Sequence, residues 1–184
     1  VYGALGLTKN GNGLYDIISQ ATGKTLTMNG IISDGSGTTA TQLQVGSSGN
    51  AGTVIFGGAN TYSAGTTINA GTLQLGAGPL CTGSVACDSS HTTLYSSAVG
   101  TGNVVISAGT TLDLNGYNFA SSYLVSKPSI TMSGSSSGNA TLTNSSTGTS
   151  VTVYGALGLT KNGNGLYDII SQATGKTLTM NGII

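Results

Sequence analysis

The chain contains a copy of its own beginning. Residues 1–32 recur letter for letter as residues 153–184, an offset of 153 − 1 = 152 positions in a chain of 184 residues. A fixed period is the signature of repeat architecture, in which each unit buries its apolar face against its neighbours in the chain. We therefore expect residues 1–152 to be one full repeat unit, residues 153–184 to start the next identical unit, and the natural molecule to be a tandem array.

Shorter motifs lie within the period. In each, a threonine or serine is followed by alternating apolar residues and then by glycine: residues 25–30, 53–57, 72–76, 111–116 and 129–134. Alternation with a period of two predicts a strand with one buried face, and the glycine permits the positive φ of a tight corner. Successive motifs start 18 to 28 residues apart, except for one interval of 39 residues.

This spacing favours a β-solenoid, in which each coil stacks on the coil before it. A β-sandwich is the alternative, but an array of sandwiches needs linkers, and no proline-rich or charged linker occurs near residues 150–153. In a continuous solenoid, residues 152–154 should stack on strands near residues 130–143, and residues 177–180 should repeat the setting of residues 25–28. At roughly 19 to 25 residues a coil, the 152-residue period predicts roughly six to eight coils.

Charged residues are scarce, which excludes several functions. They make up 5% of the chain, whereas an average soluble domain has roughly 25%. The five bases are all lysine and the five acids are all aspartate, so no nucleic-acid partner is expected. The hydrophobic fraction of 38% argues against disorder, and no apolar run approaches the roughly 18 residues that a membrane-spanning helix needs. We expect a folded chain without a membrane span and, since it begins with Val1 and not with Met, a piece of a mature protein.

Residues 56–76, FGGANTYSAGTTINAGTLQLG, closely resemble the passenger-associated repeat of bacterial autotransporters. Residues 25–37 and 103–116 are similar to ordinary coils of the same family. The resemblance implies a right-handed parallel β-helix that is secreted across an outer membrane and displayed at the cell surface, often as an adhesin.

The two cysteines, Cys81 and Cys87, are close enough to bridge across a small loop. One pair without a second pair or a histidine pair is poor spacing for zinc. The alternatives are a disulfide and two reduced thiols in a surface loop. We expect the disulfide, and the resemblance agrees, since such passengers carry few and closely spaced cysteines. Such a bridge should close a side loop and not hold the core.

Neither of the two candidate catalytic arrangements is convincing. His91, the one histidine, follows Asp88 and two serines, but no Gly-x-Ser-x-Gly elbow presents a nucleophile. A glycosidase needs two close carboxylates, and the aspartates of one period lie on different predicted coils: Asp16, Asp34, Asp88 and Asp113. We expect a structural role for His91 and turn or capping roles for the aspartates. No catalytic, cofactor-binding or metal-binding residue is assigned, no cofactor is expected, and the protein is predicted not to be an enzyme.

These observations predict a structural extracellular β-solenoid that forms a long fibre at the cell surface, with copies of itself as end-to-end partners. Low charge suits this role because stacked coils place like residues about 4.8 Å apart, where repeated charges would repel. One alternative is an adhesin or ligand-binding passenger that uses a loop such as residues 81–87 to bind surface glycans or other cells. A carbohydrate-active β-helix enzyme is the second alternative.

Overall fold

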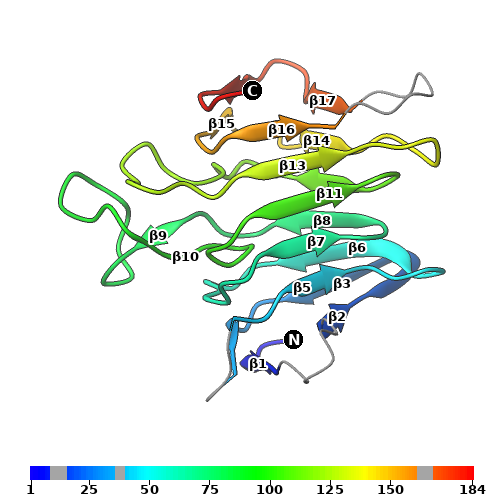
Figure 1. Ribbon diagram of the computed structural model, residues 1–184, viewed down its shortest axis with the longest axis horizontal. Helices are drawn as coiled ribbons and strands as arrows, with labels where there is room; N and C mark the ends of the chain where they lie inside the picture. Colours follow the sequence, from blue (N-terminus) through cyan, green and yellow to red (C-terminus); the bar gives the residue numbers. More distant parts are fainter. Residues whose placement is uncertain (9–15, 36–39, 161–167) are drawn as a thin grey trace.

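The computed structural model describes residues 1–8, 16–35, 40–160 and 168–184, which form a parallel β-solenoid with no helix in those ranges (Figure 1). Two six-stranded parallel sheets run along it. The first sheet contains β2 (Asp16–Ile18), β5 (Leu43–Val45), β7 (Thr66–Ile68), β11 (Val104–Ser107), β13 (Ile130–Ser133) and β16 (Leu157–Leu159). The second sheet contains β3 (Gln20–Met28), β6 (Ala51–Phe56), β8 (Thr72–Leu75), β12 (Thr111–Asp113), β14 (Thr141–Asn144) and β17 (Ile169–Gln172).

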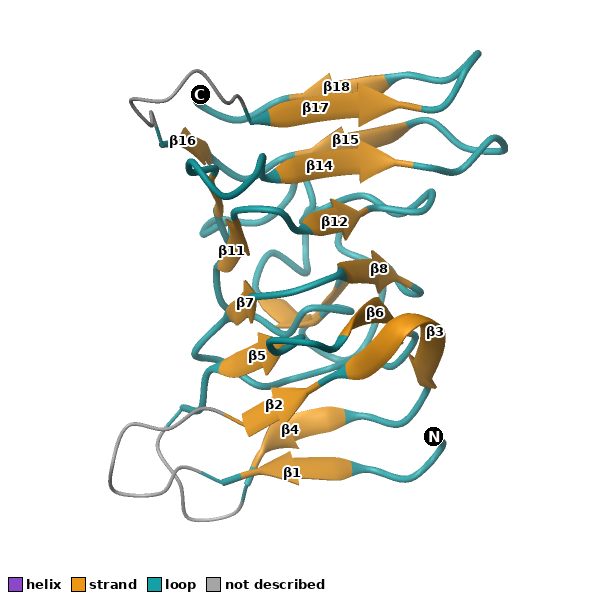
Figure 2. Cartoon of the chain, turned by 90° about the vertical axis from the view of Figure 1, so that its right-hand side faces the viewer, coloured by secondary structure: helices purple, strands orange, loops and turns teal. Residues whose placement is uncertain are grey.

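The coil is right-handed. Strands of the first sheet point to the right in Figure 1, and the quarter turn in Figure 2 shows that this sheet lies on the side that faces the viewer in Figure 1. The chain climbs meanwhile from the N-terminus at the bottom to the C-terminus at the top. The predicted all-β fold, a right-handed parallel β-helix, is confirmed.

A third face closes the coil with shorter pairings. β1 (Leu5–Leu7) pairs with β4 (Ile32–Asp34) at the N-terminal end, and β15 (Val151–Val153) pairs with β18 (Leu178–Met180) at the other. Between them the contacts are single bridges, such as Asn60 with Ser97. The predicted motifs avoid this face, which explains why sequence periodicity missed it.

The second sheet shows how alternation builds the core. Register aligns Leu26, Val54, Leu73, Leu112 and Leu142 on successive coils, and the last four are almost fully buried. The preceding residue on each coil is threonine, so the sheet carries a file of threonines on its outer surface: Thr25, Thr53, Thr72, Thr111 and Thr141. Four predicted motifs thus lie in one sheet, whereas the fifth, residues 129–134, supplies β13 of the first sheet.

Glycine is required where corners of adjacent coils touch. Gly46 has φ +78°, and a Cβ there would overlap the Ala70 carbonyl of the next coil. Gly71 has φ +74° and would collide with the Gly52 carbonyl in the same way. Both positions need the left-handed conformation and a missing side chain, so coils approach closely at these corners.

The number of coils in one period follows from how often the chain crosses the third face. The face is crossed successively at Leu5–Leu7, Ile32–Asp34, Asn60, Ser97, Phe119 and Val151–Val153, which makes five turns. Leu157–Leu159 repeats Leu5–Leu7 (157 − 5 = 152) but lies one face further on, in the first sheet. One period therefore takes about five and a third turns, and the expected six to eight coils were too many. The reason is one long coil, which uses 104 − 66 = 38 residues between β7 and β11.

Among the described residues, no helix is long and apolar enough to cross a membrane.

Candidate functional site

The junction between the two copies lies inside a strand. β15 spans residues 151–153, and the second copy begins at Val153. Val153 bridges Phe119 of the coil below, the amide of Tyr154 donates to the Phe119 carbonyl at 3.1 Å, and Thr152 N donates to Asn118 Oδ1 at 2.8 Å. The backbone ladder therefore continues through the boundary without a linker.

The next two strands of the second copy extend the two long sheets. β16 pairs with β13 through Ile130↔Leu157, and β17 pairs with β14 through Thr141↔Ile169. Asp168 adds a side-chain bond, accepting from the amide of Gly134 at 3.0 Å. Both strands of the second copy thus lie on a coil that belongs to the first copy.

Two expectations about the junction were wrong. Residues 152–154 stack on Phe119 and not on strands near residues 130–143, because those strands form the other two faces. Residues 177–180 do not share the face of residues 25–28, since β18 pairs with β15 whereas residues 25–28 pair with β6. Both deviations follow from the extra third of a turn in each period.

Contacts within each copy are nevertheless repeated. Asn29 N donates to Val1 O at 2.8 Å, and the equivalent Asn181 N donates to Val153 O at 2.8 Å. The pair Leu5 N to Ile31 O, at 2.9 Å, recurs one period later at 2.8 Å. The second copy is the first copy rotated by one face, and it keeps these backbone bonds. Equivalent side chains change partner, since Asp16 accepts from Thr8 N whereas Asp168 accepts from Gly134 N of the first copy.

A long side loop, residues 76–103, leaves the solenoid between β8 and β11; we call it the disulfide loop (Figure 1, left). Within it, β9 (Leu80–Cys81) and β10 (Leu94–Ser96) form an antiparallel pair. Cys81 and Cys87 form a disulfide, with their Cα atoms 4.9 Å apart. Cys81 is 0% exposed and packs within the hydrophobic core. The bridge closes a side loop, and the expectation that it does not hold the core stays a prediction.

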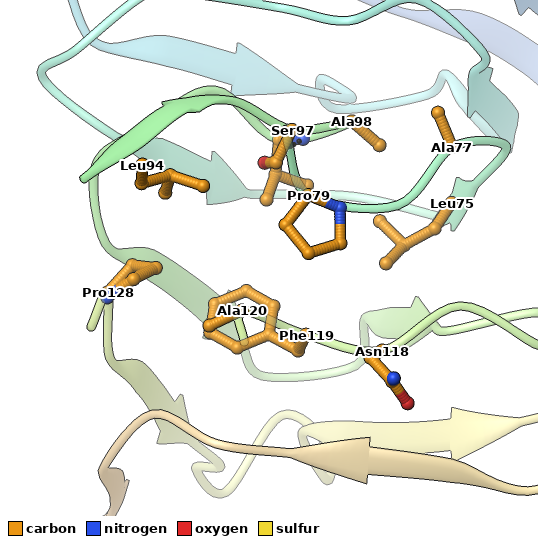
Figure 3. A pocket seen from close by; sticks show the side chains of 11 residues that line it. Leu75, Ala77, Pro79, Leu94, Ser97, Ala98, Asn118, Phe119, Ala120 and Pro128 are labelled. Atoms are coloured by element: carbon orange, nitrogen blue, oxygen red, sulfur yellow. Dashed lines mark hydrogen bonds between the residues drawn. The ribbon is translucent and has the colours of Figure 1, made fainter. Parts of the chain in front are cut away.

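A second loop, residues 117–129, leans on the disulfide loop; we call it the neighbouring loop. The amide of Val125 donates to the Thr92 carbonyl at 3.1 Å, and buried Leu124 anchors the loop. A cavity of about 10 Å³ lies where the loops meet the coils, with Pro79, Leu94 and Phe119 among its lining (Figure 3). This volume is about that of one water-sized probe, so it is a packing gap and not a binding site.

His91 and Asp88 form a local turn. The His91 ring Nδ1 lies 3.0 Å from Asp88 Oδ1, which also accepts from the amides of Ser90 and His91. These hydrogen bonds, that of the His91 ring first, hold the pKa of the Asp88 carboxyl below its ordinary value. Both side chains are exposed, and the His91 ring pairs with a carboxylate only three residues away, so the geometry is that of a capped turn.

The other described aspartates also act as hydrogen-bond acceptors in the coil. Asp16 accepts from Thr8 N at 2.9 Å, and Asp34 accepts from Ser63 Oγ at 2.7 Å. Across the described ranges, no three His, Cys, Asp or Glu side chains gather as a metal site. The aspartates thus take part in turns and coil-to-coil bonds.

Buried polar side chains that join coils were missed at the level of sequence. Asp113 is 4% exposed and accepts from Gln74 Nε2 of the coil before (2.8 Å) and from Ser145 Oγ of the coil after (2.6 Å). Asn60, fully buried, accepts from Ile32 N and donates to Ala98 O. Asp113 lies on the same outer side of β12 as Thr111 and is covered by its bonds to the two adjacent coils. In sequence both residues look like turn residues, and only the register shows that they lie buried between coils.

One family model matches the chain, that of the passenger-associated-transport-repeat, at residues 50–75. No curated protein and no solved structure matches it. The matched segment begins just before β6, passes through the corner at Asn60 and β7, and ends with β8, which pairs with β6 in parallel. Residues 50–75 therefore match the passenger-associated-transport-repeat, as the resemblance predicted, and the matched segment forms one complete coil of the solenoid.

Proposed function

We propose that this chain is a segment of a structural fibre displayed outside the cell, in which tandem copies form one uninterrupted solenoid. The observation that carries the proposal is the contrast between two identical segments. Val1 is 58% exposed, whereas its equivalent Val153 is 0% exposed beneath the same local coil. The start of a copy therefore has a surface that the end of a preceding copy covers.

The glycines at the same place show how close the fit is. A Cβ at Gly155 would overlap the carbonyl oxygen of Pro128, whereas a Cβ at Gly3 would meet nothing within 4 Å. Uncovered coil ends expose unpaired backbone groups that invite uncontrolled association. Stacking of each copy on the previous one removes that hazard along the fibre, and repeat proteins protect only their terminal units.

The extracellular location rests on two features that agree. The matched repeat is a passenger-associated one, and the two cysteines form a disulfide, which is usual in oxidising compartments. The low charge supports the stacking itself, because it allows ladders of like residues between coils.

The test is to express chains of one, two and three periods and to measure their length by electron microscopy and small-angle scattering. At about 4.8 Å per coil, five and a third turns should add about 26 Å for every period. A straight rod that lengthens in these steps supports the fibre. Bends near residue 152, or beads joined by flexible segments, would contradict it.

Adhesion is the second candidate function, and the protruding loops favour it. The disulfide loop and the neighbouring loop extend beyond the coil on one side (Figure 1) and expose Tyr95 and Tyr123, each 50% accessible. A fibre that carries such loops can also be an adhesin, so the two functions are compatible.

A further inference from the structure

A second hollow lies beside the loops, and it is assembled from both copies. The groove has a volume of about 320 Å³ and contacts the disulfide loop, the neighbouring loop and the second copy. Its lining is Pro79, Cys87, Asn118, Ala120, Ser121, Ser122, Tyr123 and Tyr154. Figure 3 shows Pro79, Asn118 and Ala120 together at the adjoining packing gap.

The chemistry of this lining is uncharged and amphipathic. Two tyrosine rings offer flat apolar surfaces that end in hydroxyl groups, and Ser121, Ser122 and Asn118 add hydroxyls and an amide. The amide of Asn118 is held in place, because its Oδ1 accepts from Thr152 N at 2.8 Å. Preorganised polar groups lower the free-energy cost of binding.

We propose that this groove binds a neutral oligosaccharide. A sugar ring has a C–H face that can lie against a tyrosine ring and a rim of hydroxyls that can pair with serine and asparagine. The volume is at the lower end of the 300–1,000 Å³ typical of ligand pockets, and it has room for about one or two sugar rings. The inference goes beyond the fibre and does not depend on it, since this chain contains the whole groove.

The lining argues against other occupants. An anionic group would need a cation, and none of the lining side chains is charged; the nearby Lys127 Nζ donates to the Leu124 carbonyl. A peptide that adds a strand would need a sheet edge, but loop residues form most of this lining.

Tyr154 makes the groove a property of the junction. Its equivalent in the first copy is Tyr2, which is 86% exposed and does not line this groove. The two tyrosines have identical sequence neighbours on their C-terminal side, and only one lines the groove. An array should therefore hold one such groove for each place where one copy follows another.

Another hollow, with a volume of about 410 Å³, provides a comparison with this groove. Thr92, Thr93, Leu94, Thr101, Val125 and Ser126 line it. It has hydroxyl groups but no aromatic ring, so we expect it to bind sugars weakly or not at all.

The test is titration of the 184-residue chain with maltotriose, cellotriose and N,N′,N″-triacetylchitotriose, followed by calorimetry and by tyrosine fluorescence, which no tryptophan obscures. We expect saturable binding of at least one sugar. Tyr123→Ala and Tyr154→Ala should each weaken it about tenfold or more, as for aromatic hot spots. Tyr2→Ala and Thr93→Ala are the matched controls and should leave the affinity unchanged.

Saturable binding of none of the three sugars would overturn the proposal, as would equal affinity in all four variants. Tighter binding of a sialylated trisaccharide than of the neutral sugars would overturn the neutral class. Circular dichroism checks each variant for folding. If Tyr154→Ala is unfolded, the exposed Tyr123→Ala still decides the outcome.

Discussion

The two ends of this chain have the same 32 residues and different surroundings. At the N-terminal end the segment has a coil on one side only, whereas in the second copy its first strands lie on coils of the preceding copy. Two backbone hydrogen bonds that close the coil within the segment recur in both places. The difference shows that the local coil is encoded by the segment itself, while burial of its lower edge depends on the copy before it.

The largest expected effect comes from the two equivalent glycines. Gly155→Val places side-chain atoms on the Pro128 carbonyl, so the second copy should detach locally, at a cost of about 3 kcal/mol or more. Gly3→Val meets open space and should change stability by less than about 0.5 kcal/mol. Amide exchange followed by NMR measures the variants, at β15–β18 for Gly155→Val and at β1–β4 for Gly3→Val. Equal effects would show that the copies do not stack as described.

Next in size is the contrast between an interior and a terminal aspartate. Asp113→Ala removes a buried acceptor and leaves donors on two other coils unpaired, which should cost about 3 kcal/mol. Asp16→Ala removes one exposed bond to Thr8 N and should cost about 1 kcal/mol or less. Denaturant unfolding of both variants gives the comparison. A smaller loss for Asp113 than for Asp16 would contradict the role of buried bonds between coils.

Reduction of the disulfide should affect the disulfide loop more than the stacked coils of either copy. The bridge closes a short loop, so its loss should cost about 2 kcal/mol in the chain-entropy model. Amide exchange should accelerate in residues 76–103. Both six-stranded sheets should stay folded, because neither contains β9 or β10 and the Cys81 side chain can stay packed in the core after reduction. Circular dichroism with and without reductant, beside a Cys81→Ala, Cys87→Ala chain, measures this. Disappearance of the β-sheet signal would show that the bridge supports the whole coil.

The smallest effect concerns Tyr62. This residue lies outside the duplicated 32-residue segment, so a substitution there tests the middle of the solenoid and not its ends. Burial raises the pKa of the Tyr62 phenol, although its bond to Thr66 Oγ1 acts in the opposite direction. The folded state favours the protonated phenol, so this stability is complete below the unfolded pKa of about 10 and is lost as the pH rises above it. Tyr62→Phe should cost about 1 kcal/mol at neutral pH and weaken the dependence above pH 10. If the free energy of unfolding of Tyr62→Phe falls above pH 10 as steeply as that of the unsubstituted chain, the pH dependence comes from other tyrosines.

Sequence alone predicted the class of fold and much of the second sheet, because alternation in segments such as Thr72–Leu75 determines which side chains point inward. It did not predict the face that each strand occupies. That assignment requires the length of every corner and loop, and the disulfide loop lengthens one coil to 38 residues. Buried groups such as Asn60 were missed because an inward asparagine and a turn asparagine have the same local sequence. The groove was missed because Tyr123 and Tyr154 are distant in sequence and belong to different copies.

The extra third of a turn in each period determines how a fibre would present its appendages. Three periods, 3 × 152 = 456 residues, would be needed before a given loop returned to the same side, after about 77 Å along the axis. Successive disulfide loops would project about 120° apart around the fibre axis. A whole number of turns would instead align every loop in one stripe and leave the other sides bare. With the fractional turn, a rod made of identical copies would offer its loops to targets that approach from any direction.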